Sequence, residues 1–315
     1  MVAEPLLSLG AFTVTAYSLA AALGCLISVC LYLFLARRFG LRGDAAEKTA
    51  FFAILLGIFC GHFLYVIVKF RGFLEDEGFL FLFAPWRGGF MFLGALIGAV
   101  LAVLLGAGNR EERRKSLNCL APAMTLFIAI MRFIEPLCGQ GNGEDTEIGF
   151  FPLSYAADPE WPQFRSAAIF FWAGLYGIVC CVILLNYLRR HQDGLKTAKL
   201  GLILYCSGEI LLESLRRDQV IKWSFVRVSQ LFCAIILVLP VLYHVIAARF
   251  KDRKAVWSLI AMAVLIGGCI ALEFSVDKPL ILGDNVIYFT DWLTYGLLGL
   301  CGALMGVIAW KNSRE

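Results

Sequence analysis

Long apolar segments separated by short polar ones make up most of the chain. Each segment has about 18 or more mostly apolar residues, enough for a helix that rises about 1.5 Å per residue to cross about 30 Å of hydrocarbon. Backbone groups inside a bilayer must be hydrogen-bonded within the protein, and no segment alternates with the period of a strand, so each is predicted to be a helix. The predicted spans lie near residues 11–36, 49–68, 88–108, 117–136, 166–188, 198–215, 228–248, 256–273 and 287–310.

Composition narrows the class of protein. Of the 315 residues, 60% are apolar and 17% are charged, a balance typical of polytopic membrane proteins and against a soluble one. The predicted fold class is therefore an all-α integral membrane bundle of about nine helices. The 11 cysteines fall mostly inside apolar segments without metal-ligand spacing, and they are interpreted as buried small hydrophobic residues. No metal, other cofactor or nucleic-acid partner is predicted.

Basic residues gather in alternate loops. Four inter-helix segments carry four Lys or Arg residues each, and they alternate with loops that are acidic or mixed; the basic segments are 37–48, 110–115, 189–199 and 249–254. Cytoplasmic loops are enriched in Lys and Arg, so the N-terminus is predicted to lie outside and the C-terminus in the cytoplasm. That arrangement needs an odd number of spans, as nine gives. Because basic residues follow the first apolar run, the run is expected to stay in the membrane as a span.

Ionisable residues enter the apolar pattern at the end of the fourth predicted span. Arg132 and Glu135 lie one helical turn apart, and the helix is predicted to break at Pro136 into a loop with three glycines. A charged side chain at mid-bilayer costs about 2.5 to 3.5 kcal/mol, and less near a helix end. The pair therefore has two interpretations, a functional site or a structural ion pair at a helix terminus.

The sixth predicted span carries a second group. Glu209 and Glu213 lie four residues apart on one face, and Glu213 is expected to reach Arg216 at three residues and Arg217 at four. Two carboxylates so placed repel each other unless nearby cations or hydrogen bonds compensate their charge. We therefore predict a buried polar network that joins the fourth and sixth spans, with Arg132 as an available partner.

The external loop after the sixth span is basic, against the charge rule. It adds Lys222 and Arg227 to the two preceding arginines, and Ser229 and Gln230 follow at the outer end of the seventh span. A guanidinium group binds phosphate in a fixed fork, so this loop suits an anionic phospholipid headgroup. The alternative is that this loop has no function of its own, and that the other basic loops determine the orientation of the chain in the membrane despite its positive charge.

Three other features are candidates with a structural alternative. Tyr17 in the first span is either a site residue or part of an interfacial aromatic belt, and His62 in the second span is functional by default inside a membrane. The Gly-rich third span is predicted to pack closely on a neighbouring helix or to admit a substrate. Residues 70–86 are predicted to form an interfacial helix anchored by Trp86, and the loop after Gly143 is either a lid or a linker.

Several motifs occur in the order found in one family. They are TAYSLA around Tyr17, GHFLYVI at 61–67, GGFMFLGALIGA at 88–99, Arg132 with Gly139 and Gly143, ESLRRD at 213–218 and VSQL at 228–231. From about residue 11 to 248 the chain resembles the bacterial prolipoprotein diacylglyceryl transferases. Arg132, Gly139 and Gly143 match the arginine and two glycines of the signature motif of that family.

The chain also departs from the family pattern. Leu93 stands where the family has a third-span histidine, and Glu135 and Gln140 stand where its signature has asparagine and glutamate. His62 and Glu209 replace arginines, and the segment Trp161-Pro162-Gln163 is reduced relative to a histidine-proline-threonine-glutamine motif. These departures indicate a divergent branch. The resemblance implies a seven-helix transferase-like domain over residues 1–250, followed by two additional helices over 251–315.

The resemblance implies an activity in the bacterial plasma membrane. The diacylglyceryl group of phosphatidylglycerol, or of another anionic phospholipid, would be transferred to the lipobox cysteine thiol of a prolipoprotein, with glycerol phosphate leaving. Prolipoprotein signal peptides are therefore the expected partners.

Within that activity the candidate residues have distinct expected roles. Arg132 and Arg216 would hold the phosphate, and Arg217 and Arg227 would receive the headgroup. Glu135 or Glu213 would orient the arginines or accept the thiol proton, with His62 as the rival base. The remaining candidates are Tyr17 in the catalytic set and Gly139, Gln140, Gly143 and Gln230 in lipid binding.

Two other functions compete with transfer. The first is a non-catalytic protein that binds lipid or signal peptide on the same scaffold, which Leu93 favours and the retained Arg132 and Glu213/Arg216 pair disfavour. The second is a small-molecule transporter, which is weaker because its polar residues should line the bilayer midplane, whereas these cluster toward the outer leaflet.

Overall fold

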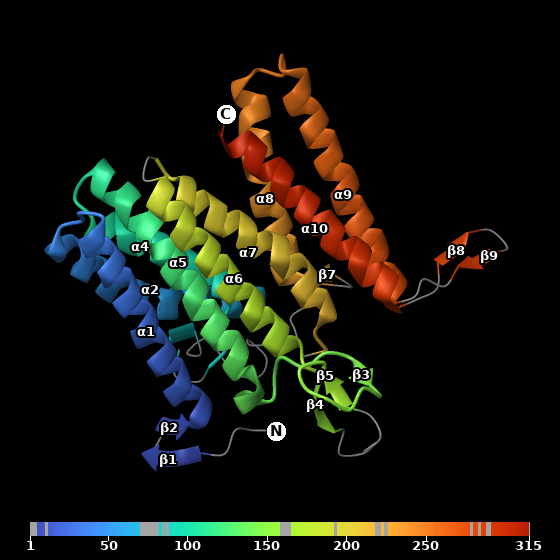
Figure 1. Cartoon of the computed structure of the whole chain (residues 1–315), viewed down its shortest axis with the longest axis horizontal. Helices are drawn as coiled ribbons and strands as arrows, with labels where there is room; N and C mark the ends of the chain where they lie inside the picture. Colours follow the sequence, from blue (N-terminus) through green and yellow to red (C-terminus); the bar gives the residue numbers. More distant parts are fainter. Residues whose placement is uncertain are drawn as a thin grey trace. The chain divides into compact units, whose positions relative to one another are not determined.

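A computed structural model shows that helices form most of the chain (Figure 1). The residues it describes are 5–9, 12–69, 82–83, 85, 88–157, 165–191, 194–217, 222–223, 226–277, 280–282, 285–287 and 291–314. The helices are α1 (Ala16–Arg38), α2 (Gly43–Val68), α4 (Phe92–Gly106), α5 (Arg110–Ile134), α6 (Ile169–Arg190), α7 (Lys196–Leu215), α8 (Val228–Ala247), α9 (Arg253–Asp277) and α10 (Asp291–Arg314). Each predicted span overlaps one of them, with different ends.

Short antiparallel strands occupy several of the connections. The hairpins are β1 (Pro5–Leu9) with β2 (Phe12–Thr15), β6 (Lys222–Trp223) with β7 (Val226–Arg227), and β8 (Leu280–Leu282) with β9 (Asn285–Ile287). A three-stranded sheet in the order β3-β5-β4 forms from β3 (Asp145–Thr146), β4 (Ser154–Ala157) and β5 (Arg165–Ala167). The loop after Gly143 therefore contains a small sheet, whereas Trp86 and residues 161–163 lie outside the described ranges.

The first predicted span begins too early. Residues 12–15 form β2, and α1 starts only at Ala16. The side chain of Thr15 accepts a hydrogen bond from the backbone N of Ser18, and the side chain of Ser18 accepts one from the backbone N of Thr15. This capping box fixes the start of the helix, and apolarity alone does not reveal it.

Seven of the described helices are long and apolar enough to cross a membrane. They are α1, α2, α5, α6, α8, α9 and α10. α4 is apolar but has 15 residues, and α7 has 20 residues but carries Lys196, Lys199, Glu209 and Glu213. The chain is thus a multi-pass, all-α membrane helix bundle, and the count of nine crossings stays a prediction.

The chain divides into two compact units. The first comprises residues 1–140 and 177–198, and the second comprises residues 141–176 and 199–315. These units differ from the division at residue 250 that the resemblance implies. That division marks where the family motifs end, whereas the two units reflect how the chain packs. That division stays a prediction.

In the first unit α4 packs closely on α2. Cβ atoms at Gly94 and Gly98 would collide with the backbone carbonyl groups of Cys60 and Leu56. Small residues let helix backbones approach one another in a membrane. The interpretation of this Gly-rich segment as a packing helix is confirmed. Part of the same core is the buried Tyr32, whose hydroxyl lies 2.7 Å from Oγ of Ser116.

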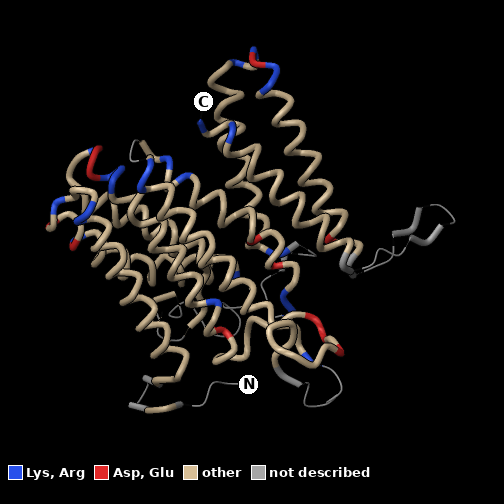
Figure 2. Tube along the Cα trace, in the orientation of Figure 1, with Lys and Arg blue, Asp and Glu red and all other residues tan. Residues whose placement is uncertain are grey.

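Charge is segregated within the first unit. Lys and Arg residues gather where α1 ends, where α2 and α5 begin, and where α6 ends (Figure 2). Contacts join these ends: Arg42 forms an ion pair with Glu112 at 3.4 Å, and Nδ2 of Asn118 donates to the carbonyl of Gly194 at 2.8 Å. Basic residues at one end of a membrane bundle agree with the charge rule, and the orientation itself stays a prediction.

In the second unit α7, α8, α9 and α10 share one core. Its fully buried members include Cys206 on α7, Leu237 on α8, Met262 on α9 and Met305 on α10. At one end of this bundle, Nζ of Lys199 donates to the carbonyl of Ser313 at 2.9 Å. The last turn of α10 therefore lies beside the first turn of α7.

A glycine substitution tests the contact between α7 and α10. A Cβ atom at Gly302 would lie 2.7 Å from the backbone carbonyl oxygen of Ser207, whereas one at Gly296 on the same helix would meet nothing within 4 Å. We expect Gly302→Ala to lower the free energy of unfolding in detergent by about 1–3 kcal/mol, because backbone has to move. Gly296→Ala should be neutral or raise it by about 0.5–1 kcal/mol. Equal melting temperatures for the two variants would contradict this packing.

Candidate functional site

The end of α5 holds the first polar cluster, which lies in the first unit. The helix ends at Ile134 and continues as the 3-10 helix η3 (Glu135–Cys138), which has Pro136 in its first turn and is closed by Gly139 in the left-handed conformation, with φ 73°. The predicted break at Pro136 is confirmed. A positive φ of this kind favours glycine, so Gly139 has a structural reason to be there.

Arg132 and Glu135 form a buried ion pair at this helix end. Nη1 of Arg132 donates to Oε1 of Glu135 at 2.9 Å, and the two residues are 8% and 9% exposed. The spacing of three residues predicted this contact. Tyr17, in the first turn of α1, lies within electrostatic range of both. The backbone N of Gln140 donates to the carbonyl of Glu135. The structure thus brings together Tyr17, Arg132, Glu135 and Gln140.

His62 has a defined tautomer in the first unit. Its Nδ1 lies 3.1 Å from the carbonyl oxygen of Gly88 and 3.0 Å from that of Gly89, and the side chain is 1% exposed. Because both partners are carbonyl oxygens, Nδ1 carries a proton. A neutral His62 then has its lone pair on Nε2, and the ring ties α2 to the segment that precedes α4.

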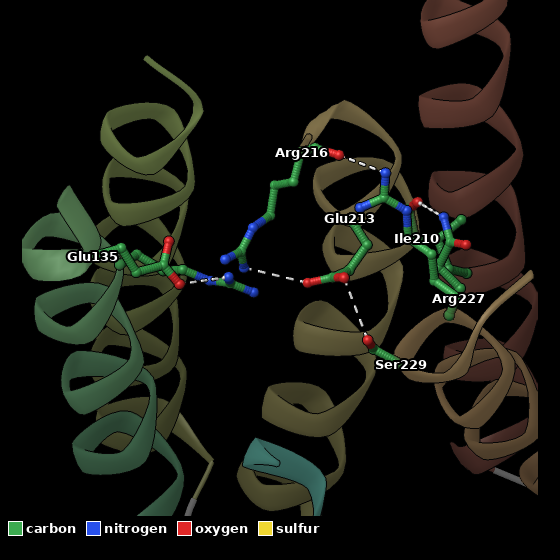
Figure 3. Close-up of polar contacts among 8 residues, drawn as sticks. Glu135, Ile210, Glu213, Arg216, Arg227 and Ser229 are labelled. Atoms are coloured by element: carbon green, nitrogen blue, oxygen red, sulfur yellow. Dashed lines mark hydrogen bonds and ion pairs between the residues drawn. The ribbon is translucent and has the colours of Figure 1, made fainter. Parts of the chain in front are cut away.

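The second unit holds the other polar cluster, at the end of α7 and the start of α8 (Figure 3). Glu213 accepts from Nη1 of Arg216 at 3.3 Å through Oε1 and from the hydroxyl of Ser229 at 3.3 Å through Oε2. Nη2 of Arg227 donates to the backbone carbonyl of Arg216. The residues Glu213, Arg216 and Arg227 are 4%, 7% and 7% exposed. Two buried arginines are therefore linked to each other through the Arg216 backbone, and one of them pairs with Glu213.

Gln230 lies next to this cluster with its amide nitrogen fixed. Nε2 of Gln230 donates to the carbonyl of Ile210 at 3.0 Å and to Oγ of Ser214 at 2.7 Å. Oγ of Ser214 lies 2.7 Å from Oε2 of Glu273 on α9. Glu273 is the last residue of the predicted span 256–273, and its spacing from the other polar residues gives no signal of this contact.

The expected contact between Arg217 and Glu213 is wrong. α7 ends at Leu215, so Arg217 no longer follows the helical face. Its Nη2 instead donates to Oε1 of Glu144 at 3.0 Å, and the hydroxyl of Tyr295 donates to the same oxygen at 3.2 Å. The hydrogen bond and the negative charge of Glu144 raise the pKa of Arg217, although burial opposes this.

Gly143 is held between two elements of the second unit. Its backbone N donates to the carbonyl of Ala167 at 2.8 Å. A Cβ atom at Gly143 would lie 2.5 Å from Cγ1 of Ile169 and 3.0 Å from the carbonyl oxygen of Leu215. The packing between the start of α6 and the end of α7 therefore requires glycine. This requirement is independent of any lipid.

Several expectations stay predictions. The network joining the fourth and sixth spans through Arg132 and Glu213 pairs residues of different units, and it stays a prediction. Leu93, which replaces the family histidine, is buried on α4. Glu209 is also buried, at 4% exposure. In the described ranges, no group of three or more His, Cys, Asp or Glu residues is arranged to hold a metal ion.

The fold and these clusters define a class of protein: a multi-pass, all-α membrane protein with buried ion pairs where helices end. Comparison with known proteins then gives the family. A model described as prolipoprotein diacylglyceryl transferase matches residues 4–246. The chain belongs to this family, and α9 and α10 lie beyond the matched residues.

Individual relatives are distant but cover most of the chain. A protein of Clostridium perfringens named phosphatidylglycerol--prolipoprotein diacylglyceryl transferase 2 is 26% identical over 246 residues, which are 76% of this chain and 92% of that protein. A phosphatidylglycerol--prolipoprotein diacylglyceryl transferase of Ligilactobacillus salivarius is 24% identical over 265 residues, 80% of this chain and 95% of that protein. The chain is thus a divergent member of a family of transferases.

The buried pair on α5 can be tested against an exposed pair on the same helix. Removing one partner of a buried ion pair leaves an uncompensated charge, so Arg132→Gln should lower the free energy of unfolding by about 3–5 kcal/mol. Lys115 and Glu111 form a pair at 2.9 Å whose side chains are 37% and 76% exposed. Lys115→Gln should lower the free energy of unfolding far less, because exposed ion pairs are screened by solvent and contribute little.

Denaturant unfolding of both single variants and of Arg132→Gln with Glu135→Gln measures this difference. The double variant should recover part of the loss. If Arg132→Gln were no more costly than Lys115→Gln, the pair on α5 would have no structural role.

Proposed function

We propose that this protein transfers the diacylglyceryl group of phosphatidylglycerol to the lipobox cysteine thiol of prolipoproteins, in the plasma membrane of a bacterium. A carbon–sulfur bond forms while the bond between the glyceryl carbon and the phosphate oxygen breaks. Glycerol phosphate leaves, and the thiol proton passes to a base. Family membership and the names of the relatives support this reaction.

The observation that supports it best is the pair of buried guanidinium groups in the second unit. Arg216 forms an ion pair with Glu213, Arg227 donates to the backbone carbonyl of Arg216, and Nη1 of Arg227 is buried without a hydrogen-bond partner within the described residues. A buried donor without a partner is costly, so a ligand that accepts from this nitrogen would gain its hydrogen bond without first displacing a protein group. Guanidinium groups match phosphate geometry, and low solvent exposure strengthens the attraction.

The proposed roles follow from the positions of these groups. Arg216 and Arg132 are the proposed phosphate ligands, and the carboxylates of Glu213 and Glu135 hold them in place. Negative charge develops on the leaving phosphate oxygen, and a preorganised cation there accelerates the reaction.

The base is proposed to be one of three groups. Glu135, Glu213 and the Nε2 atom of His62 are the candidates, because a cysteine thiol with a pKa of about 8.5 is mostly protonated at neutral pH. Tyr17, near Arg132 and Glu135, is a proposed catalytic partner.

The proposed lipid contacts come from both units. In the second unit they are Arg217 and Arg227 for the headgroup, with Gln230 and Gly143, and in the first unit they are Gly139 and Gln140. The proposed topology has nine crossings, an external N-terminus and a cytoplasmic C-terminus. Prolipoprotein signal peptides are the proposed protein partners.

A non-catalytic role on the same scaffold is the second candidate. Leu93 and Glu209 stand where family members carry a histidine and an arginine, which favours a chain that binds lipid or signal peptide without transfer. The formed Glu213–Arg216 pair favours retained phosphate binding under either function.

Label transfer tests the reaction directly. The purified protein is incubated with phosphatidylglycerol labelled in the diacylglyceryl group and a synthetic lipobox peptide, and the label on the peptide cysteine is measured. Arg216→Ala and Arg132→Ala should each lower the rate by about a hundredfold or more, as loss of a preorganised donor does. Arg38→Ala is the control and should leave the rate unchanged. Arg38 is exposed and lies at the C-terminal, basic end of α1, far along the helix from Tyr17.

Two results would change the proposal. An Arg132→Ala, Arg216→Ala double variant with wild-type transfer would end the assignment of these residues. No transfer by the wild type, together with saturable phosphatidylglycerol binding that Arg216→Ala weakens, would establish the non-catalytic role instead.

A further inference from the structure

The C-terminal hairpin formed by α9 and α10 supplies polar groups to residues of the proposed lipid site. The family match ends at residue 246, before either helix begins. Two separate contacts nevertheless join this hairpin to residues within the family match, and both lie within the second unit. Glu273 on α9 contacts Ser214, and Tyr295 on α10 contacts Glu144.

The contacts around Ser214, of which Glu273 is one, set the direction of a chain of hydrogen bonds. Gln230 uses both hydrogens of its amide, one to the carbonyl of Ile210 and one to Oγ of Ser214. Oγ of Ser214 thus acts as an acceptor, and its single hydrogen remains for Oε2 of Glu273 at 2.7 Å or the carbonyl of Ile210 at 3.1 Å. A charged acceptor at the shorter distance forms the stronger bond.

The chain therefore runs from Gln230 through Ser214 to Glu273. This chain of hydrogen bonds also determines the position of the amide oxygen, Oε1, of Gln230. Once both hydrogens of Nε2 are committed, the side chain cannot flip, and Oε1 is fixed as an acceptor. An amide oxygen held in this way can accept a hydrogen bond from a hydroxyl group and cannot form that bond with a headgroup that lacks one.

The position of Glu273 on an apolar helix supports a specific use. α9 is apolar enough to cross a membrane. A carboxylate on such a helix has a free-energy cost of burial that an apolar residue would avoid. Burial of Ser214 and Gln230, at 7% and 8% exposure, keeps solvent from weakening the hydrogen bonds between them.

The contact at Tyr295 is independent and concerns charge. Its hydroxyl donates to the same oxygen of Glu144 that receives Arg217, so α10 helps to hold the carboxylate that orients this arginine. Arg217 is a proposed phosphate contact, which is common to every anionic phospholipid.

We infer that Glu273, acting through Ser214, is a positioning residue that orients Gln230 to accept a hydrogen bond from a hydroxyl group of the lipid headgroup. This inference rests on the proposed function. It makes the hairpin of α9 and α10 a contributor to recognition of the headgroup hydroxyl, through a residue that lies beyond the family match.

The test compares two lipids of equal charge. Transfer and saturable binding by the full chain are measured with phosphatidylglycerol and with phosphatidylethanol, whose headgroup has no hydroxyl. The wild type should prefer phosphatidylglycerol. Glu273→Ala should lower this preference about tenfold, mainly through KM for phosphatidylglycerol, and leave phosphatidylethanol unaffected. Gln230→Ala should give the same loss, and the double variant should add little.

Three further variants separate positioning from folding. Glu273→Gln keeps an oxygen acceptor for Ser214 and should retain part of the preference. Tyr295→Phe should weaken both lipids alike, because phosphate is common to both. Ser275→Ala, whose hydroxyl donates to the carbonyl of Leu272 within α9, should change neither lipid.

The outcomes distinguish this inference from the proposed function. An active wild type whose lipid preference is unchanged by Glu273→Ala would overturn the inference and leave the transferase in place. A wild type that binds without transferring, with a preference that Glu273→Ala removes, would overturn transfer and sustain the inference. A wild type that neither binds nor transfers either lipid would overturn both.

Discussion

Charge buried in an apolar helix bundle is the constraint on which this structure depends. Every buried arginine of the two clusters lies where a helix starts or stops: Arg132 at the end of α5, Arg216 after α7, and Arg227 before α8. At such places the cost of burial is lower, and backbone groups without helical partners are available. The carbonyl of Arg216, which accepts from Arg227, is one of them. Helix ends therefore determine where chemistry can occur in this fold.

Local contacts were predictable from the sequence because they depend on spacing along one helix. The ion pairs of Arg132 with Glu135 and of Glu213 with Arg216 each follow from a separation of three residues. The helices themselves followed from segment length and apolarity. Their ends were less accessible, since the start of α1 depends on the capping box of Thr15 and Ser18, and the end of α7 redirects Arg217.

Contacts between distant residues could not be read in this way. Glu144 meets Tyr295 across 151 residues, and Ser214 meets Glu273 across 59. No periodicity links such pairs, because their approach depends on how whole helices pack. Gly143 gives the same lesson: its motif assigned it to lipid binding, and the structure adds close packing against Ile169 and Leu215. A motif can thus have a packing reason that its sequence context does not show.

The hairpin of α9 and α10 has a consequence for the history of the chain. Helix α10 packs against Ser207 through Gly302 and Gly306, where no side chain fills the space. On α9, the carboxylate of Glu273 accepts a hydrogen bond from the hydroxyl of Ser214. A descendant that lost residues 253–314 would expose this surface of α7 and lose the carboxylate that Ser214 contacts. Its second unit would therefore be less stable, although the lost helices lie beyond the residues that the family model matches.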